Sequence, residues 1–204
     1  LSERRQNIPK PNLSQICVED RKIYTGENGY HRYDGWELSE MPVPGGPGRY
    51  VANGSEHDVM GDTTHLAERH IQMTTRRFSK LDLLSDGSFE VLNEEADIAV
   101  MPWGGSKGPA QAAYEELVEL GGELCWFYTM YLNPLPPELL EKLKAKKLVI
   151  VPELNYMGQF GSVLRSYGVK AESITQYTGL PFKVSDLVNR IGESVRQHKL
   201  DGVA

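Results

Sequence analysis

The sequence predicts an α/β domain, a parallel sheet between two layers of helices (α/β/α), preceded by a long irregular arm. Continuous apolar runs alternate with helical patterns from residue 81 onward, as in strands buried on both faces of a sheet. Turn-forming Gly, Pro and Asn residues interrupt almost every candidate element before that point. The 204 residues, 40% of them hydrophobic, allow one globular domain with a segment to spare.

The arm, residues 1–80, is poor in regular structure but rich in aromatic side chains. A single helix is predicted in it, over residues 64–80, where apolar positions recur at helical spacing. The aromatic residues before this helix are Tyr24, Tyr30, Tyr33, Trp36 and Tyr50. Because flexible linkers are depleted in aromatics, we expect the arm to pack on another surface, with Tyr33, Trp36 and Tyr50 as buried anchors. A floppy linker is the alternative.

The domain, residues 81–204, is predicted as strands and helices in alternation. Strands are expected at residues 97–102, 123–130, 147–152 and 173–177. Helices are expected at residues 109–120, 136–146, 156–166 and 184–197, and Pro136 begins the second of them. Ligands on such sheets bind at the carboxyl ends of the strands, so the loops at these ends are the expected ligand-facing segments.

Charge and cysteine usage narrow the functional classes. The chain has 22 Lys and Arg against 28 Asp and Glu, a net charge of −6, which disfavours nucleic acid or an anionic membrane as the main partner. We expect no membrane span and no secretory signal, since apolar runs are short. Cys17 and Cys125 stand far apart, which argues against zinc or an iron–sulfur cluster held by this chain alone. A cytoplasmic protein with reduced cysteines is expected.

The first candidate site is Glu56-His57-Asp58, a histidine between two carboxylates on a glycine-flanked loop. Carboxylates nearby favour the charged imidazole, as a general base or an ion-pair partner needs. A hydrogen-bonded loop or interface histidine is the more common situation for this pattern. A zinc site with His65 and His70 is disfavoured, because these spacings do not bring the side chains together on one helix face.

The second candidate site is the turn at the end of the first predicted strand, with Gly104, Ser106 and Lys107. Its backbone amides and the helix that follows could hold a phosphate. The spacing is neither that of a P-loop nor GxGxxG, so a tight turn with Ser106 as the helix cap is the simpler explanation.

The third candidate site follows the strand at residues 147–152 and holds Glu153, Asn155 and Gln159. Polar groups at such a position often face a ligand or a partner domain, although Asn155 could instead cap the next helix. Gly158 beside Gln159 indicates close contact with another backbone. A serine triad has no support, because the sequence lacks a Gly-x-Ser-x-Gly elbow.

Taken together, the motifs resemble the C-terminal part of the alpha subunit of the 2-oxoacid:ferredoxin oxidoreductases, above all the 2-oxoglutarate type. Each motif is weak alone, but their order and spacing over about residues 21–195 are specific. They include Gly54-Ser55-Glu56-His57-Asp58, Met73-Thr74-Thr75-Arg76-Arg77, Trp103 to Gly108, Asn133-Pro134-Leu135-Pro136, Glu153 to Gln159 and Tyr177 to Phe182. Leu1 to Arg5 resembles the tail of a preceding pyrimidine-binding domain.

The resemblance implies an enzyme that oxidatively decarboxylates a 2-oxoacid with coenzyme A, giving acyl-CoA, carbon dioxide and reduced ferredoxin. It also implies thiamine diphosphate, magnesium and a [4Fe-4S] cluster, held by other domains and by a beta subunit rather than by this chain alone. The matching region would be a transketolase C-terminal-like domain with its arm, serving assembly and positioning and inactive in isolation. It assigns no catalytic residue and no particular 2-oxoacid. A non-catalytic flavodoxin-like interaction module and a nucleotide-binding Rossmann-type domain are the competing hypotheses.

Overall fold

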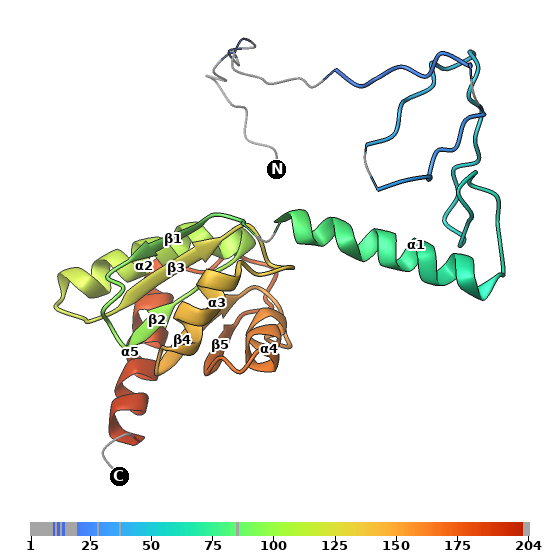
Figure 1. The fold of residues 1–204 in the computed structure, drawn as a ribbon. Helices are drawn as coiled ribbons and strands as arrows, with labels where there is room; N and C mark the ends of the chain where they lie inside the picture. The colour runs from blue at the N-terminus through green and yellow to red at the C-terminus, as the bar shows by residue number, and fades with distance from the viewer. Residues whose placement is uncertain are drawn as a thin grey trace. The chain divides into compact units, whose positions relative to one another are not determined.

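The structure, a computed structural model, describes residues 20–201 apart from 28, 37 and 85, together with residues 10, 12 and 14. It divides into two compact units, Leu1–Phe78 and Ser79–Ala204, each described by itself (Figure 1). The tail predicted at Leu1 to Arg5, and Cys17, lie outside the described residues. In the part of the chain that is described, no helix combines the length and the apolar character of a membrane span.

The second unit is built on a five-stranded sheet of order β1-β3-β2-β4-β5. The strands are β1 (Phe89–Leu92), β2 (Ile98–Val100), β3 (Cys125–Thr129), β4 (Leu148–Glu153) and β5 (Ala171–Thr175). β2 pairs in parallel with β3 and β4, and β4 with β5, whereas β1 lies antiparallel along β3. The predicted α/β class is confirmed, but the sheet is mixed rather than wholly parallel.

The edge strand β1 is the element that the sequence pattern does not predict. Its residues alternate between half-buried (Phe89, Val91) and exposed (Glu90, Leu92). It therefore lacks the continuous apolar run that marks the strands buried on both faces, and it is too short for alternation to be recognised. An antiparallel edge strand on an otherwise parallel sheet is common in such folds.

Helices cover both faces of this sheet. α2 (Lys107–Glu119) and α5 (Val184–Asp201) lie on one face, and α3 (Pro137–Lys144) and α4 (Gln159–Ser166) lie on the other (Figure 1). The first core joins strand residues to α2 and α5 through Val100, Trp126, Ile150, Tyr114, Leu187 and Ile191. The second core joins the strands to α3 and α4 through Ala99, Phe127, Val149, Leu139, Leu143 and Leu164. Successive strand residues thus face opposite layers, as the pleat requires.

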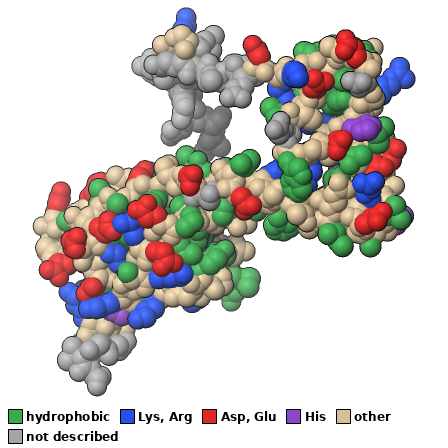
Figure 2. All heavy atoms as spheres, viewed as in Figure 1, with side chains coloured by type: hydrophobic (Ala, Val, Ile, Leu, Met, Phe, Trp, Pro, Cys, Tyr) green, Lys and Arg blue, Asp and Glu red, His purple; other side chains and the backbone are tan. Residues whose placement is uncertain are grey.

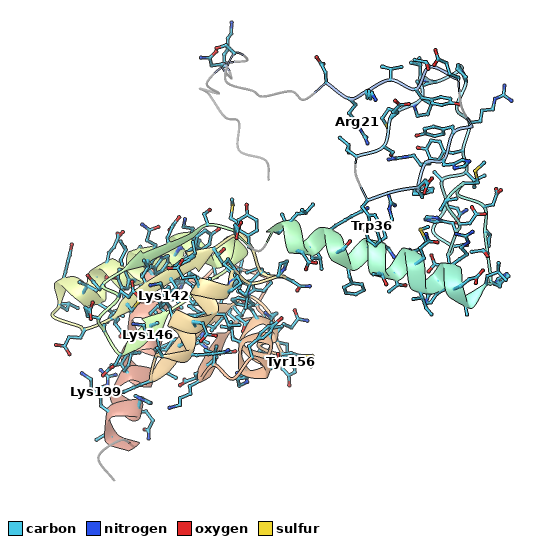
Figure 3. All side chains as sticks on the ribbon, in the orientation of Figure 1. Arg21, Trp36, Lys142, Lys146, Tyr156 and Lys199 are labelled. Atoms are coloured by element: carbon cyan, nitrogen blue, oxygen red, sulfur yellow. The ribbon has the colours of Figure 1, made fainter. Side chains whose placement is uncertain are left out.

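The first unit is organised around α1 (Ala67–Ser79), which is followed by the short 3-10 helix η2 (Lys80–Leu84). β-structure in the described part of this unit is limited to two isolated bridges, Ile23–Met41 and His57–Thr63. Aromatic rings replace a regular core here: Tyr30 contacts Tyr24 and Tyr50, and Tyr33 contacts Tyr50, at centroid distances of 4.9, 5.7 and 6.2 Å. Trp36 is 64% exposed in this chain (Figure 3), so its burial on another surface stays a prediction.

Candidate functional site

The carboxyl ends of β2 and β4 lie side by side, and the loops that leave them run to opposite faces of the sheet. β2 leads through Trp103 and the short η3 (Gly104–Ser106) to α2, whereas β4 leads through Asn155 to α4. In open α/β sheets, such a switch in direction creates the crevice where ligands usually bind. The loop of the second candidate site (Gly104, Ser106 and Lys107) and that of the third (Glu153, Asn155 and Gln159) meet here, through hydrogen bonds from Trp103 to Glu153 and from Ser106 to the Pro152 carbonyl oxygen.

Glu153, the last residue of β4, is fully buried at this switch point. Its carboxylate accepts five hydrogen bonds, from Trp103 Nε1 (3.3 Å), Asn155 Nδ2 (2.9 Å), the N–H groups of Phe160 (2.8 Å) and Gly161 (2.9 Å), and Ser173 Oγ (2.9 Å). Burial alone raises the pKa of Glu153, but hydrogen bonds to the ionised form outweigh it and lower that pKa overall. The carboxylate therefore joins the β2 loop, the first turn of α4 and β5.

Ser106 is buried between the two loops and connects them. Its Oγ lies 2.8 Å from the Trp103 carbonyl oxygen and 2.9 Å from the Pro152 carbonyl oxygen, and it accepts the Trp103 N–H at 3.2 Å. Ser106 occupies the position before α2, but its side chain makes no hydrogen bond to the amides of that helix. Ser106 is therefore the N-cap residue of α2 as predicted, but its hydroxyl connects the two loops instead of bonding to the helix amides.

Lys107, the charged side chain of this turn, points away from the switch point. Lys107 Nζ lies 2.7 Å from Glu90 Oε1 and 3.8 Å from the centre of the Tyr128 ring, a cation–π distance. Gly104 is exposed with φ +54°, a left-handed backbone that suits glycine. Lys107 is thus directed to β1 and β3, and the nucleotide hypothesis gains no support from it.

Asn155 organises the start of α4. Its Nδ2 donates to Glu153, and its Oδ1 accepts the N–H of Gln159, the first residue of the helix, at 3.2 Å. The Gln159 side chain is exposed. The close approach expected at Gly158 occurs, but to a side chain rather than a backbone: a Cβ at Gly158 would lie 2.7 Å from Ser173 Oγ.

In the first unit, the carboxylates of Glu56-His57-Asp58 diverge from the histidine between them. Glu56 receives Arg77 through Nη1–Oε1 (3.1 Å) and Nη2–Oε2 (2.8 Å), while His70 Nδ1 lies 2.6 Å from Oε2. The hydrogen bond from Arg77 is the main reason why the pKa of Glu56 is lowered to about 2. Asp58 Oδ1 instead accepts three N–H groups of its own loop, those of Met60, Gly61 and Asp62.

His57 itself is a loop histidine. Its Nδ1 lies 2.9 Å from the Asp58 carbonyl oxygen, and its ring lies 4.1 Å from that of Tyr33, with an angle of 35° between the planes. The expected contact between the ring and a carboxylate is not found among the described residues. The placement fits the loop interpretation better than that of a general base.

Side chains that could bind a metal ion are scattered in the structure. Among the described residues, no group of three or more His, Cys, Asp and Glu side chains is arranged to hold an ion. Cys125 is buried in β3, and burial raises the pKa of its thiol to about 11. Since thiolates are the ligands of iron–sulfur clusters, this cysteine does not suit such a cluster.

Several partners in these sites have no strong sequence signal. Arg77 and His70 reach Glu56 from a helix that begins eleven residues later, at Ala67, and no short motif links them. Trp103, in the loop after β2, and Ser173, in β5, reach Glu153 from the two sides of β4, so their roles require the strand order β2-β4-β5. The local sequence signal for the Glu153 site is a carboxylate at the end of a strand, followed by Gly158 and Gly161 at the start of the next helix.

Comparison with curated proteins gives several relatives, although no family model matches the chain. The KorA subunit of the 2-oxoglutarate oxidoreductase of Mycobacterium tuberculosis is 32% identical over 167 residues, which are 77% of this chain and 24% of that protein. The alpha subunit of the 2-oxoacid:ferredoxin oxidoreductase of Saccharolobus solfataricus is 31% identical over 170 residues, 78% of this chain and 27% of that protein. The chain thus spans about a quarter of the length of these two relatives.

A solved structure agrees with these relatives. The 2-oxoglutarate:ferredoxin oxidoreductase from Magnetococcus marinus, with 2-oxoglutarate, coenzyme A and succinyl-CoA bound, matches with a TM-score of 0.76 and 31% sequence identity. The match covers 91% of this chain and 34% of that chain. The resemblance inferred from the motifs is confirmed: the chain is a homologue of part of the alpha subunit of the 2-oxoacid:ferredoxin oxidoreductases.

Proposed function

We propose that the chain is the C-terminal part of the alpha subunit of a cytoplasmic, thiamine diphosphate-dependent 2-oxoglutarate:ferredoxin oxidoreductase. The complex oxidatively decarboxylates 2-oxoglutarate with coenzyme A to succinyl-CoA and carbon dioxide, and ferredoxin takes up the electrons. The observation that carries the proposal is the match, over 91% of the chain, to a solved enzyme that holds 2-oxoglutarate, coenzyme A and succinyl-CoA.

The proposal assigns thiamine diphosphate, magnesium and the [4Fe-4S] cluster to other domains and to a beta subunit. The described residues do not suit the metal-containing groups, because they offer no cluster of ligating side chains and Cys125 is a buried thiol of raised pKa. The proposal therefore assigns no catalytic step to the described residues of this chain.

This region acts in assembly and positioning. A general base must offer a lone pair to the substrate. Glu153 instead accepts five internal hydrogen bonds, and Glu56 is held by Arg77 and His70. Such contacts stiffen the loops in which they lie, which is what a positioning domain requires.

The test is anaerobic co-expression of the complete alpha subunit with its beta subunit, followed by assays of viologen dye reduction. We expect reduction that requires both 2-oxoglutarate and coenzyme A, with slower rates for pyruvate and branched-chain 2-oxoacids, and bound thiamine diphosphate and iron in the complex. The 204-residue chain alone is expected to be inactive. Dye reduction by the isolated chain, or a complex without thiamine diphosphate, contradicts the proposal.

A further inference from the structure

The loop that precedes α1 contains an asparagine followed by a glycine, Asn53-Gly54. In such a pair the side-chain amide carbon lies within reach of the next backbone nitrogen, so an intramolecular attack closes a five-membered ring. A side chain on the second residue obstructs this attack, and glycine has none. Asparagine is one of the thermally labile residues of proteins. The surroundings of an Asn-Gly pair therefore decide how readily it reacts.

The backbone at Asn53-Gly54 is open to solvent. Asn53, Gly54 and Ser55 are all exposed and lie outside helices and strands. Figure 2 shows backbone and uncharged polar atoms, drawn in tan, over much of the visible surface of the first unit. A Cβ at Gly54 would meet no described atom within 4 Å. The Gly54 N–H finds no acceptor among the described residues, so the attacking nitrogen is available.

Two hydrogen bonds orient the Asn53 side chain. Its Oδ1 accepts the N–H of Ser55 at 2.7 Å, and its Nδ2 donates to the Gly61 carbonyl oxygen at 3.3 Å. The first bond lies on the oxygen that gains negative charge when a nucleophile adds to the amide carbon, so it stabilises that charge. The second bond is long for an N–H···O contact, so the departing nitrogen is held only weakly.

The other described asparagines lack this combination. Each is followed by a residue that carries a side chain, and Pro134, which follows Asn133, has no N–H with which to attack. Asn155 is also held more firmly, because its Nδ2 donates at 2.9 Å to the buried Glu153 carboxylate. These residues are Asn12, Asn93, Asn133, Asn155 and Asn189.

We propose that Asn53-Gly54 is a site of spontaneous deamidation, a covalent modification that requires only water. The Gly54 nitrogen loses its proton to solvent and bonds to Asn53 Cγ, while the Cγ–Nδ2 bond breaks and Nδ2 takes up a proton and leaves as ammonia. The product is a succinimide ring, and water then opens either of its carbonyl groups. One opening gives aspartate, and the other gives isoaspartate, in which the main chain runs through the former side chain.

The modification removes an attachment of the loop. Either product has a carboxylate in place of the amide, so the donor to the Gly61 carbonyl oxygen is lost and two oxygen atoms face each other instead. The turn at Gly61 itself remains, because Asp58 Oδ1 accepts N–H groups within it. Isoaspartate also lengthens the main chain. The contact between the chain at residue 53 and the 57–63 loop is therefore the one that deamidation breaks.

The test incubates the complete alpha subunit, in complex with its beta subunit, at pH 8 and follows two tryptic peptides by mass spectrometry. Peptide 50–69 contains Asn53 as its only Asn or Gln, so a gain of one dalton reports this site, and peptide 148–165, which contains Asn155, is the internal control. We expect progressive conversion of the first peptide to a mixture of isoaspartate and aspartate, distinguished by electron-transfer fragmentation, and an unchanged second peptide.

Gly54→Ala tests the role of the unobstructed nitrogen. The alanine has space, and φ of Gly54 lies outside the left-handed range, so the variant should keep the wild-type melting temperature. Conversion of peptide 50–69 should slow about tenfold or more. Gly105→Ala, at a glycine with equally open surroundings outside this loop, is the matched control and should convert as wild type does. A wild-type peptide that stays intact, equal rates in Gly54→Ala, or aspartate as the sole product overturns the proposal.

Asn53→Asp tests the effect on the loop, since it carries the charge of the product without the lengthened main chain. Amide hydrogen exchange over residues 57–64 should accelerate about twofold to tenfold, the range for one lost hydrogen bond. Unchanged exchange overturns the assigned effect. None of these outcomes depends on the proposed function, which is tested by activity.

Discussion

Arg77 binds Glu56 through two parallel hydrogen bonds, which join α1 to the loop that begins 21 residues earlier. The planar guanidinium matches both carboxylate oxygens, and His70 adds a third contact on Oε2. The described part of the first unit has few regular backbone pairs, so this side-chain connection is a main attachment of the 57–63 loop to α1.

Replacing Arg77 by Lys is expected to loosen this loop. A lysine retains the charge but provides a single point of attachment in place of the fork. Amide hydrogen exchange in residues 57–64 should accelerate about twofold to fivefold, the range for partly exposed ion pairs. The control is Arg69→Lys, since the one side-chain partner of Arg69 among the described residues is Gln72 in the same helix, and this variant should leave the exchange unchanged. Equal protection in both variants would show that the fork does not hold the loop.

Replacing Glu153 by Gln should destabilise the second unit. The amide group retains one acceptor but turns an NH₂ toward donors, so buried N–H groups of α4 lose their partner, at a cost of about 2–3 kcal/mol. Chemical denaturation measures the change in the free energy of unfolding. Glu141→Gln, at an exposed carboxylate paired with Lys144, should stay within about 0.5 kcal/mol of wild type. Similar effects of the two substitutions would refute the structural role of Glu153.

The same carboxylate predicts a pH dependence. Because the pKa of Glu153 is lower in the folded state than in the unfolded chain, its ionised form stabilises the fold above the unfolded pKa. This contribution is lost as the pH falls through the folded value. Denaturation curves between pH 3 and pH 7 should therefore show a smaller loss of stability on acidification in Glu153→Gln than in wild type. Parallel pH profiles would contradict the assignment.

Gly161→Ala tests the close packing of α4 on β5. A Cβ at Gly161 would clash with Ser173 Oγ and lie 3.2 Å from Glu153 Oε1, so the hydroxyl, the helix or the strand must move, and we expect a loss of about 1–3 kcal/mol. Ser173→Ala in the same chain should recover part of it by removing the hydroxyl. Gly105→Ala is the control, since a Cβ at Gly105 would meet no described atom within 4 Å. A loss that Ser173→Ala does not reduce at all would locate the strain elsewhere.

The Cys125 thiol should resist alkylation in the folded protein. With its pKa raised to about 11, it is almost wholly protonated at pH 8, and the buried site also excludes the reagent. Iodoacetamide labelling followed by mass spectrometry of the Cys125 peptide should proceed at least about a hundredfold more slowly than in guanidinium chloride. Rapid labelling of the native protein would mean that β3 opens readily.

The sequence predicts the second unit well because apolar content and helical spacing decide its elements. The predicted helix at 109–120 corresponds to α2 at Lys107–Glu119, and the strand at 147–152 to β4 at Leu148–Glu153. β1 escapes prediction because it has only four residues, so the pattern of Phe89 and Val91 is too short to recognise without its pairing to β3. Propensity is a weak guide for a short half-buried edge strand.

The sequence predicts the positions of the candidate sites but not their contacts. Strand ends locate Glu153 and Ser106 correctly at the switch point, since parallel strands bring their carboxyl ends to one edge. The partners of Glu153 come from three neighbouring segments, so only the tertiary arrangement identifies them. Adjacency in sequence, in turn, does not guarantee contact. Glu56 and Asp58 are neighbours of His57 in the sequence, but Glu56 bonds to Arg77 and Asp58 to the N–H of Gly61.

Residues 154–164 and 173–182 contain no Asp, Glu, Lys, Arg or His, which determines how contacts of these segments respond to ionic strength. Added salt screens interactions between charged groups but leaves apolar contacts intact or strengthens them. Any apolar contact made by these segments therefore tolerates concentrated salt, whereas the Glu56–Arg77 connection of the first unit weakens with it. A salt titration thus separates the two kinds of contact within one polypeptide.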